Sequence, residues 1–142
     1  MDSLFERLIE RLNGLFQSKH SILIVEDHEE TAAFLCIFLK NHGYRVKRAG
    51  DGQQGFELAM STRPDLVLLD ITMPKMDGKE TLRQLKNHAR TEKIPVLMCT
   101  ERSELDEVEK CCLWGAVGYI LKPFETQRLL TKVEETLRDS KR

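Results

Sequence analysis

Short strand-like runs alternate with amphipathic segments along most of this sequence, and this alternation limits the fold more than any other feature. The predicted strands are SILIV, YRVKRA, DLVLLD, IPVLMC and GYIL, and a segment with helical periodicity follows each of them. Strands and helices that alternate in this way require right-handed crossovers and a parallel sheet covered on both faces. We therefore expect a doubly wound α/β fold built on five parallel strands.

The predicted strands end in polar or charged residues. The first strand ends in Glu26 and Asp27, the third in Asp70, the fourth in Thr100 and the fifth in Lys122. In open parallel sheets, ligands bind outside the carboxyl ends of the strands, where the strand order reverses. If the order is 2-1-3-4-5, the first and third strands are neighbours there. Asp27 and Asp70 would then come within reach of one ion.

Three clustered carboxylates repel one another and raise each other's pKa, whereas a hard cation such as Mg²⁺ turns them into ligands. Such a site suits phosphoryl chemistry, in which Asp70 is the nucleophile and the Lys122 ammonium neutralises the transferred charge. The Thr100 hydroxyl can donate a hydrogen bond to a phosphoryl oxygen. The pattern predicts a magnesium-dependent phosphoryl site.

Each of these residues also has a local explanation. Glu26 and Asp27 could cap the helix that follows them, and Thr100 could cap a later one. Asp70 could open a turn, and Lys122 could belong to an ordinary loop. The appearance of all of them at the strand ends of one sheet favours the site.

The strings ILIVED, DLVLLDITMPKMDG, IPVLMCT and GAVGYILKPF, in this order, extend the argument to a family. Together they resemble the receiver domain of two-component response regulators, in particular stand-alone receivers of the chemotaxis-regulator type, over about residues 20–138. The resemblance implies the flavodoxin-like strand order 2-1-3-4-5. It also implies that Asp70 accepts phosphate from a histidine kinase or a phosphotransfer protein. Mg²⁺ would be bound by Glu26, Asp27, Asp70 and the backbone carbonyl of Thr72.

The same resemblance implies further roles. Lys122 would contact the acyl phosphate, Thr100 and Tyr119 would form the switch pair, and the Lys122–Pro123 peptide would be cis. The chain would then be a phosphoacceptor that assists its own phosphotransfer and dephosphorylation, not an enzyme. The sequence departs from the usual pattern at Glu101, where the family mostly has Ala or Gly. We expect Glu101 to restrict the movements of Thr100 and Tyr119.

Residues 1–17 have no counterpart in a minimal receiver. They form a predicted amphipathic helix, which residues 18–20 join to a receiver domain at 21–142. The helix could bind a second copy, pack on its own receiver, fray or lie on a membrane surface. Mixed acids and bases on its polar face make the membrane the weakest of these, and we expect a homodimer. Its apolar arc consists of Leu4, Phe5, Leu8, Ile9, Leu12, Leu15 and Phe16.

A second interface candidate lies on the fourth predicted helix. Leu105, Val108 and Cys112 share one stripe there, and Trp114 falls nearly opposite at about 100° per residue. A tryptophan off the core stripe is a candidate anchor for a partner protein. The alternative is that the helix has already ended and Trp114 folds back over the loop.

Composition excludes several function classes. The net charge of -1 over 142 residues gives no general footprint for nucleic acid, and no apolar run is long enough to span a membrane. We therefore expect a cytoplasmic protein. Its four cysteines lack CxxC spacing and are expected to be reduced.

Two other function classes compete with the phosphoacceptor. A phosphatase of the haloacid dehalogenase type needs a second acid two residues after its nucleophile, and Thr72 stands there. A receiver-like interaction module independent of phosphorylation is the remaining alternative. The sequence ends soon after the last predicted helix, and a DNA-binding helix-turn-helix is not found there. We therefore expect the output to be contact with a downstream protein effector.

Overall fold

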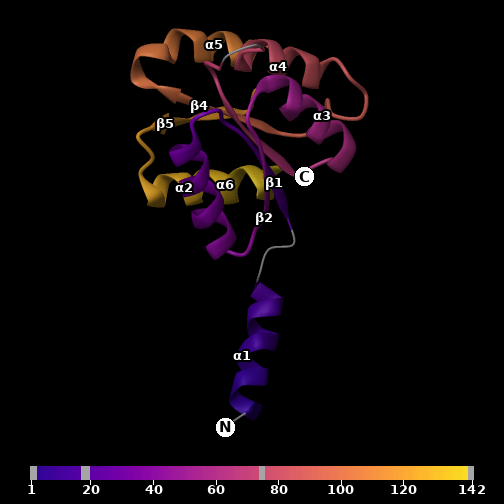
Figure 1. The fold of residues 1–142 in the computed structure, drawn as a ribbon, viewed down its shortest axis with the longest axis vertical. Coiled ribbons are helices and arrows are strands. Elements are labelled where there is room, and N and C mark those ends of the chain that lie inside the picture. Colours follow the sequence, from indigo (N-terminus) through magenta and orange to yellow (C-terminus); the bar gives the residue numbers. More distant parts are fainter. Residues whose placement is uncertain (1–2, 17–19, 74–75, 141–142) are drawn as a thin grey trace.

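The computed structural model describes residues 3–16, 20–73 and 76–140. At its centre lies one parallel sheet with the strand order β2-β1-β3-β4-β5, as predicted. Figure 1 shows the strands between two layers of helices. The strands are β1 (Ser21–Val25), β2 (Arg45–Ala49), β3 (Leu66–Asp70), β4 (Val96–Glu101) and β5 (Gly118–Lys122).

Five helices cover the two faces of this sheet. They are α2 (Glu29–Asn41), α3 (Gly52–Thr62), α4 (Gly78–Lys86), α5 (Leu105–Leu113) and α6 (Thr126–Asp139). One apolar core packs α3, α4 and α5 on one face, and a second packs α2 and α6 on the other. Both cores draw on β3, whose residues are all buried because side chains alternate between the two covered faces.

Local sequence signals explain where the helices begin and end. The side chain of Asp51 caps α3 by accepting a hydrogen bond from Gln54 N–H, and Asp77 caps α4 in the same way. The helix α2 ends at Asn41 with His42 as its C-cap, and Gly43 follows with a φ of 91°, a conformation that favours glycine.

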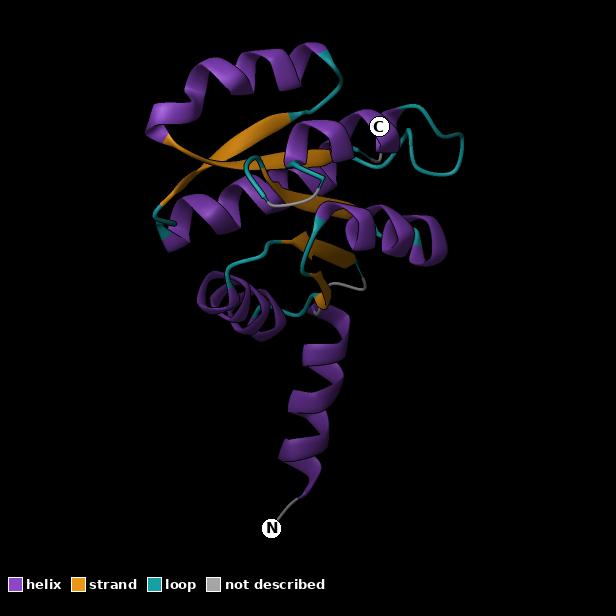
Figure 2. Cartoon of the chain, turned by 45° about the horizontal axis from the view of Figure 1, so that its top comes forward, coloured by secondary structure: helices purple, strands orange, loops and turns teal. Residues whose placement is uncertain are grey.

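The helix α1 (Ser3–Phe16) lies apart from this domain. In Figures 1 and 2 it points away from the sheet, and none of the substantial packing contacts among the described elements involves it. The exposed fraction is 80% for Leu4 and 72% for Phe5. Leu8, Ile9 and Leu12 are exposed as well.

Some predictions for this region fall on residues that the structure does not describe. Residues 18 and 19 of the predicted joint lie outside the described residues, as do the side chains of Leu15 and Phe16. For the described part of the apolar arc, packing on the chain's own receiver is not observed. No described helix is both long and apolar enough to cross a lipid bilayer.

Candidate functional site

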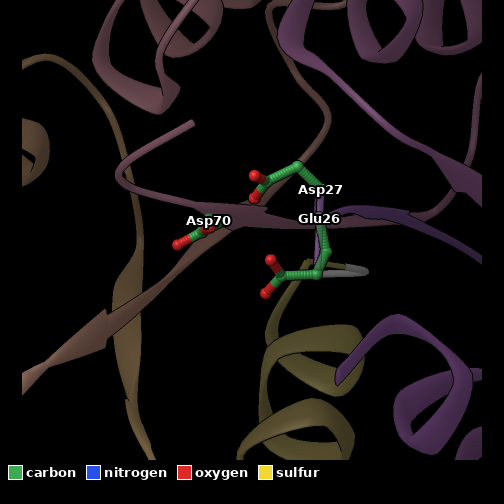
Figure 3. Close-up of side chains that lie close together, drawn as sticks. All are labelled: Glu26, Asp27 and Asp70. Atoms are coloured by element: carbon green, nitrogen blue, oxygen red, sulfur yellow. The ribbon is translucent and has the colours of Figure 1, made fainter. Parts of the chain in front are cut away.

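The predicted acidic residues come together at the carboxyl edge of the sheet. Glu26 and Asp27 directly follow β1, and Asp70 is the last residue of the neighbouring β3. One carboxylate oxygen from each lies within 4.8 Å of the others. Figure 3 shows Glu26 and Asp27 on either side of the end of β1, with their carboxylates on the side where Asp70 lies. Glu26 and Asp70 are 1% and 7% exposed, whereas Asp27 is exposed.

Lys122, the last residue of β5, bridges the two buried acids. Its Nζ lies 2.7 Å from Glu26 Oε1 and 3.1 Å from Asp70 Oδ1. Burial opposes the charge of this ammonium, but the hydrogen bond to Glu26 and the charge of Asp70 outweigh it and raise the pKa of Lys122. The ammonium therefore stays charged between two acids.

The two buried acids are not equivalent. Burial and the charge of Glu26 raise the pKa of Asp70 to about 7, although Lys122 acts in the opposite direction. For Glu26, burial is outweighed by hydrogen bonds from Lys122 Nζ and from the backbone N–H of His28, which hold its pKa below the usual value. Glu26 is therefore the acid that pairs with Lys122 in its ionised form. The negative charge of Glu26 makes ionisation of Asp70 less favourable.

Arg48, on β2, fixes the chain segment that presents the first two acids. Its guanidinium donates to the backbone carbonyl of Glu26 at 3.0 and 3.2 Å, and to that of Asp27 at 3.3 Å. No motif or strand-end position in the sequence singles out this residue. The β2 run contains several basic residues, and only the fold distinguishes Arg48 from the exposed Arg45 and Lys47.

The donor set of the edge fits a hard divalent cation. Two buried carboxylates face one ammonium, so the buried groups carry excess negative charge when both acids are ionised. The third carboxylate, Asp27, is exposed, so the site can be reached from solvent. Oxygen donors of this kind suit Mg²⁺, which takes one or two carboxylates and keeps several waters. The acidic cluster can therefore hold a metal ion.

Thr100 is fully buried near the end of β4, and its hydroxyl is already engaged. The hydroxyl donates to the carbonyl of Glu101 at 3.1 Å and makes a longer contact of 3.4 Å with Glu104 Oε1. Thr72, two residues after Asp70, donates its own hydroxyl to Glu104 Oε2. The predicted role of the Thr72 carbonyl stays a prediction.

Glu104 is a second site residue that was not predicted from the sequence. It ends the short 3-10 helix η1 (Arg102–Glu104) and forms a capping box with Glu101, whose N–H donates to its carboxylate at 3.0 Å. The spacing Glu101-x-x-Glu104 was visible in the sequence. Glutamate is not a preferred cap, however, so the signal was weak. The side chain of Glu101 itself is exposed.

Tyr119 lies on β5, outside the cluster of acids. It is 42% exposed and lines a surface cavity of about 610 Å³ between β5 and α6. The peptide between Lys122 and Pro123 is cis, as the resemblance implied.

Trp114 follows the last residue of α5, so the alternative in which the helix ends before it holds. The ring is half-buried against the core under α5, and the Arg83 guanidinium carbon lies 3.9 Å from its centroid. The predicted stripe is wrong at one position, because Cys111 is buried and Cys112 is exposed. The buried residues of α5 recur every three positions, at Val108 and Cys111, which turns Cys112 outward. All four cysteines are free thiols.

A family model, curated relatives and solved structures all indicate one family for this chain. Residues 22–134 match the family model for the response regulator receiver domain. The DNA-binding dual master transcriptional regulator RpaA of Synechocystis is 36% identical over 121 residues, which is 85% of this chain and 50% of that protein. The chain spans about half the length of this curated relative.

Solved structures agree with the sequence match. The chemotaxis protein CheY4 of Vibrio cholerae superposes with a TM-score of 0.79 and 26% identity, over 84% of this chain and 99% of that one. The receiver domain of the sensor histidine kinase PA1611 of Pseudomonas aeruginosa, solved with magnesium in its active-site cleft, has a TM-score of 0.78. The two sequences are 27% identical, and the match covers 84% of this chain and 98% of the PA1611 receiver. The chain therefore belongs to the response regulator receiver domain family.

Proposed function

We propose that Asp70 accepts a phosphoryl group from a phosphohistidine of a sensor histidine kinase or a phosphotransfer protein. The observation that carries this proposal is the position of Asp70. It is a buried carboxylate at a strand end, with two further acids within 4.8 Å and an ammonium 3.1 Å away. A carboxylate that only opened a turn would need none of these neighbours.

The chemistry uses this chain's own groups. An oxygen of ionised Asp70 attacks phosphorus while the bond from phosphorus to the imidazole nitrogen breaks. The imidazole leaves with the electron pair of that bond. Lys122 would neutralise charge on the transferred group, because its ammonium lies 3.1 Å from Asp70, and burial of Asp70 would strengthen that interaction.

A magnesium ion would be held by Glu26, Asp27, Asp70 and the backbone carbonyl of Thr72. Bound there, it would supply positive charge beside the phosphoryl oxygens. The raised pKa of Asp70 supports such an ion, because added positive charge favours the ionised, nucleophilic carboxylate. The magnesium in the cleft of the PA1611 receiver supports the same choice of metal.

The signal then leaves through protein contacts. Thr100 and Tyr119 would form the switch pair, and Tyr119 opens onto the cavity between β5 and α6, where a downstream protein effector can bind. We place the chain in the cytoplasm with its phosphodonors. DNA binding is a property of RpaA as a whole protein, and nothing in the net charge of -1 favours it here.

We also propose that α1 pairs with α1 of a second copy. Its described apolar side chains face water and make no substantial packing contact with the domain. Covering five of them in each copy gains about 1.5 kcal/mol per side chain, enough in total to offset an association cost of about 4–15 kcal/mol. Residues of both signs, such as Glu6 and Arg7, adjoin the stripe, so two copies do not repel. A two-fold pair closes without leaving a further exposed stripe.

Incubation with phosphoramidate, a small phosphodonor, tests the phosphoacceptor proposal. We expect intact-mass analysis to find one added phosphoryl group in the presence of Mg²⁺ and none after chelation with EDTA. The alternative, a receiver-like module that acts without phosphorylation, predicts no added group under either condition.

A further inference from the structure

Three hydrogen-bond donors from two separate chain segments, the loop after β3 and the end of β4, converge on the carboxylate of Glu104. Thr72 Oγ1 donates to Oε2, and Glu101 N–H donates to Oε1 at 3.0 Å. Thr100 Oγ1 lies 3.4 Å from the same Oε1. Thr72 follows Asp70 by two residues, and Thr100 is the last residue but one of β4, the strand that pairs with β3. One carboxylate therefore joins the two chain segments that border the phosphorylation site.

The Thr100 hydroxyl has a single proton to donate, and both of its present acceptors lie on the segment from Glu101 to Glu104. A phosphoryl group on Asp70 would compete for that proton. Because hydrogen bonds to ionised acceptors are the stronger ones, the Glu104 carboxylate is a more effective competitor than a neutral group would be.

We propose that Glu104 is a positioning residue that holds Thr100 in the orientation of the unphosphorylated state. This inference rests on the proposed phosphorylation of Asp70. In the resting state Glu104 shares the Thr100 hydroxyl with the carbonyl of Glu101, and Glu104 is itself held in place by the Thr72 hydroxyl. For Thr100 to bind the phosphoryl group, its contact with Glu104 must break. The free energy of that contact therefore reduces the net free energy of the switch.

The expected effect can be measured as an affinity. Beryllium fluoride with Mg²⁺ is a tetrahedral mimic of the phosphoryl group on aspartate, and its binding does not depend on rates of phosphorylation. We titrate it into the full chain at saturating Mg²⁺ and follow the backbone amide resonances of residues 96–104. Glu104→Gln should bind it about three- to tenfold more tightly than the wild type, since a neutral amide holds Thr100 less well.

Two variants control for a purely structural role. Gln at position 104 retains the acceptor that the capping box needs, so η1 should persist. Glu109→Gln removes the same charge from an exposed position on α5, and it should bind the mimic as the wild type does.

A double-mutant cycle isolates the contact with Thr100. In a Thr100→Val background the gain from Glu104→Gln should vanish, because the competing hydroxyl is gone. An equal gain in both backgrounds would overturn the proposal, since it would report a general loosening of the loop. Unchanged or weaker binding in Glu104→Gln would overturn it too.

The experiment also separates this inference from the function on which it rests. If the wild-type chain binds no mimic and takes no phosphoryl group from phosphoramidate, the phosphoacceptor function itself fails. If the wild type binds the mimic and Glu104→Gln binds it equally well, only the positioning role fails.

Discussion

Two regions of this molecule depart from the usual distribution of residues, and they do so in opposite senses. At the carboxyl edge of the sheet, Glu26, Asp70 and Lys122 carry charges that are largely removed from water. On α1, Leu4 and Phe5 leave most of their apolar surface in water. Buried charge and exposed apolar surface are both unfavourable, so each region should become more stable when a ligand or a partner protein binds to it.

The two regions differ in how far contacts within the chain offset this unfavourable free energy. The edge already compensates part of it internally, because the Lys122 ammonium contacts both buried acids. The helix α1 has no such internal compensation among the described contacts. The edge should therefore stay folded and responsive to small ions, whereas α1 should depend on another protein surface.

Loss of the Asp70 carboxylate should have the largest effect. Asp70→Asn leaves a side chain of nearly the same shape but no nucleophilic oxygen, so phosphoramidate and Mg²⁺ should add no phosphoryl group at all. Intact-mass analysis measures this. Asp106→Asn, which removes an exposed acid from α5, should be labelled like the wild type. Label that persists in Asp70→Asn would move the acceptor to another residue.

The second prediction concerns α1. Leu8→Gln with Leu12→Gln should raise the dimer dissociation constant by about 10⁴-fold, because the dimer loses four leucine side chains at roughly 1.5 kcal/mol each. Sedimentation equilibrium of the full chain measures this. The matched control, Glu6→Gln with Arg7→Gln, changes the polar face and keeps the net charge.

Dimers that survive the leucine variants, or a wild-type chain that is monomeric throughout, would contradict pairing through α1. Phosphorylation by phosphoramidate should be unchanged in the leucine variants. If the leucine variants lost both dimerisation and labelling, the carboxyl edge would not function independently of α1.

Metal binding should give a smaller, graded effect. At a Mg²⁺ concentration about 100 times the dissociation constant, stabilisation is roughly 2.7 kcal/mol, which corresponds to a rise of about 5–10 °C in the unfolding midpoint. Asp27→Asn should lose most of this rise, because it removes the exposed acid of the cluster. Differential scanning fluorimetry measures the midpoints, with Glu30→Gln on α2 as the control. A full Mg²⁺ response in Asp27→Asn would exclude Asp27 as a ligand.

The sheet and the acidic edge were predictable from the sequence for a physical reason. Residues at the ends of parallel strands must meet at one edge once the strand order is known, so Glu26, Asp27 and Asp70 follow from topology alone. The apolar run of β3, residues 66–69 before Asp70, was predictable as well, because a strand covered on both faces admits few polar residues.

Side-chain contacts in the loops were not predictable in this way. The contact of Glu104 with Thr72 and Thr100 depends on one turn of 3-10 helix before α5, which shifts where the carboxylate points. The error at Cys112 has a related cause, since the buried stripe of a short helix depends on its start and its tilt. Such details depend on backbone geometry, and hydrophobic periodicity carries too little information to fix them.

The smallest effect is expected at Glu101, and it bears on what makes a charge matter at this edge. The sequence suggested that Glu101 restricts Thr100, but its side chain is exposed, and the hydrogen bond that it donates to the Glu104 carboxylate comes from its backbone N–H. Alanine retains that N–H. Glu101→Ala should therefore change the affinity for beryllium fluoride by less than about twofold, well below the change in Glu104→Gln. The same amide titration measures both variants, so they are directly comparable. A gain in Glu101→Ala as large as that in Glu104→Gln would mean that bulk at position 101 restrains the switch, and that an exposed charge can govern this edge as strongly as a hydrogen-bonded one.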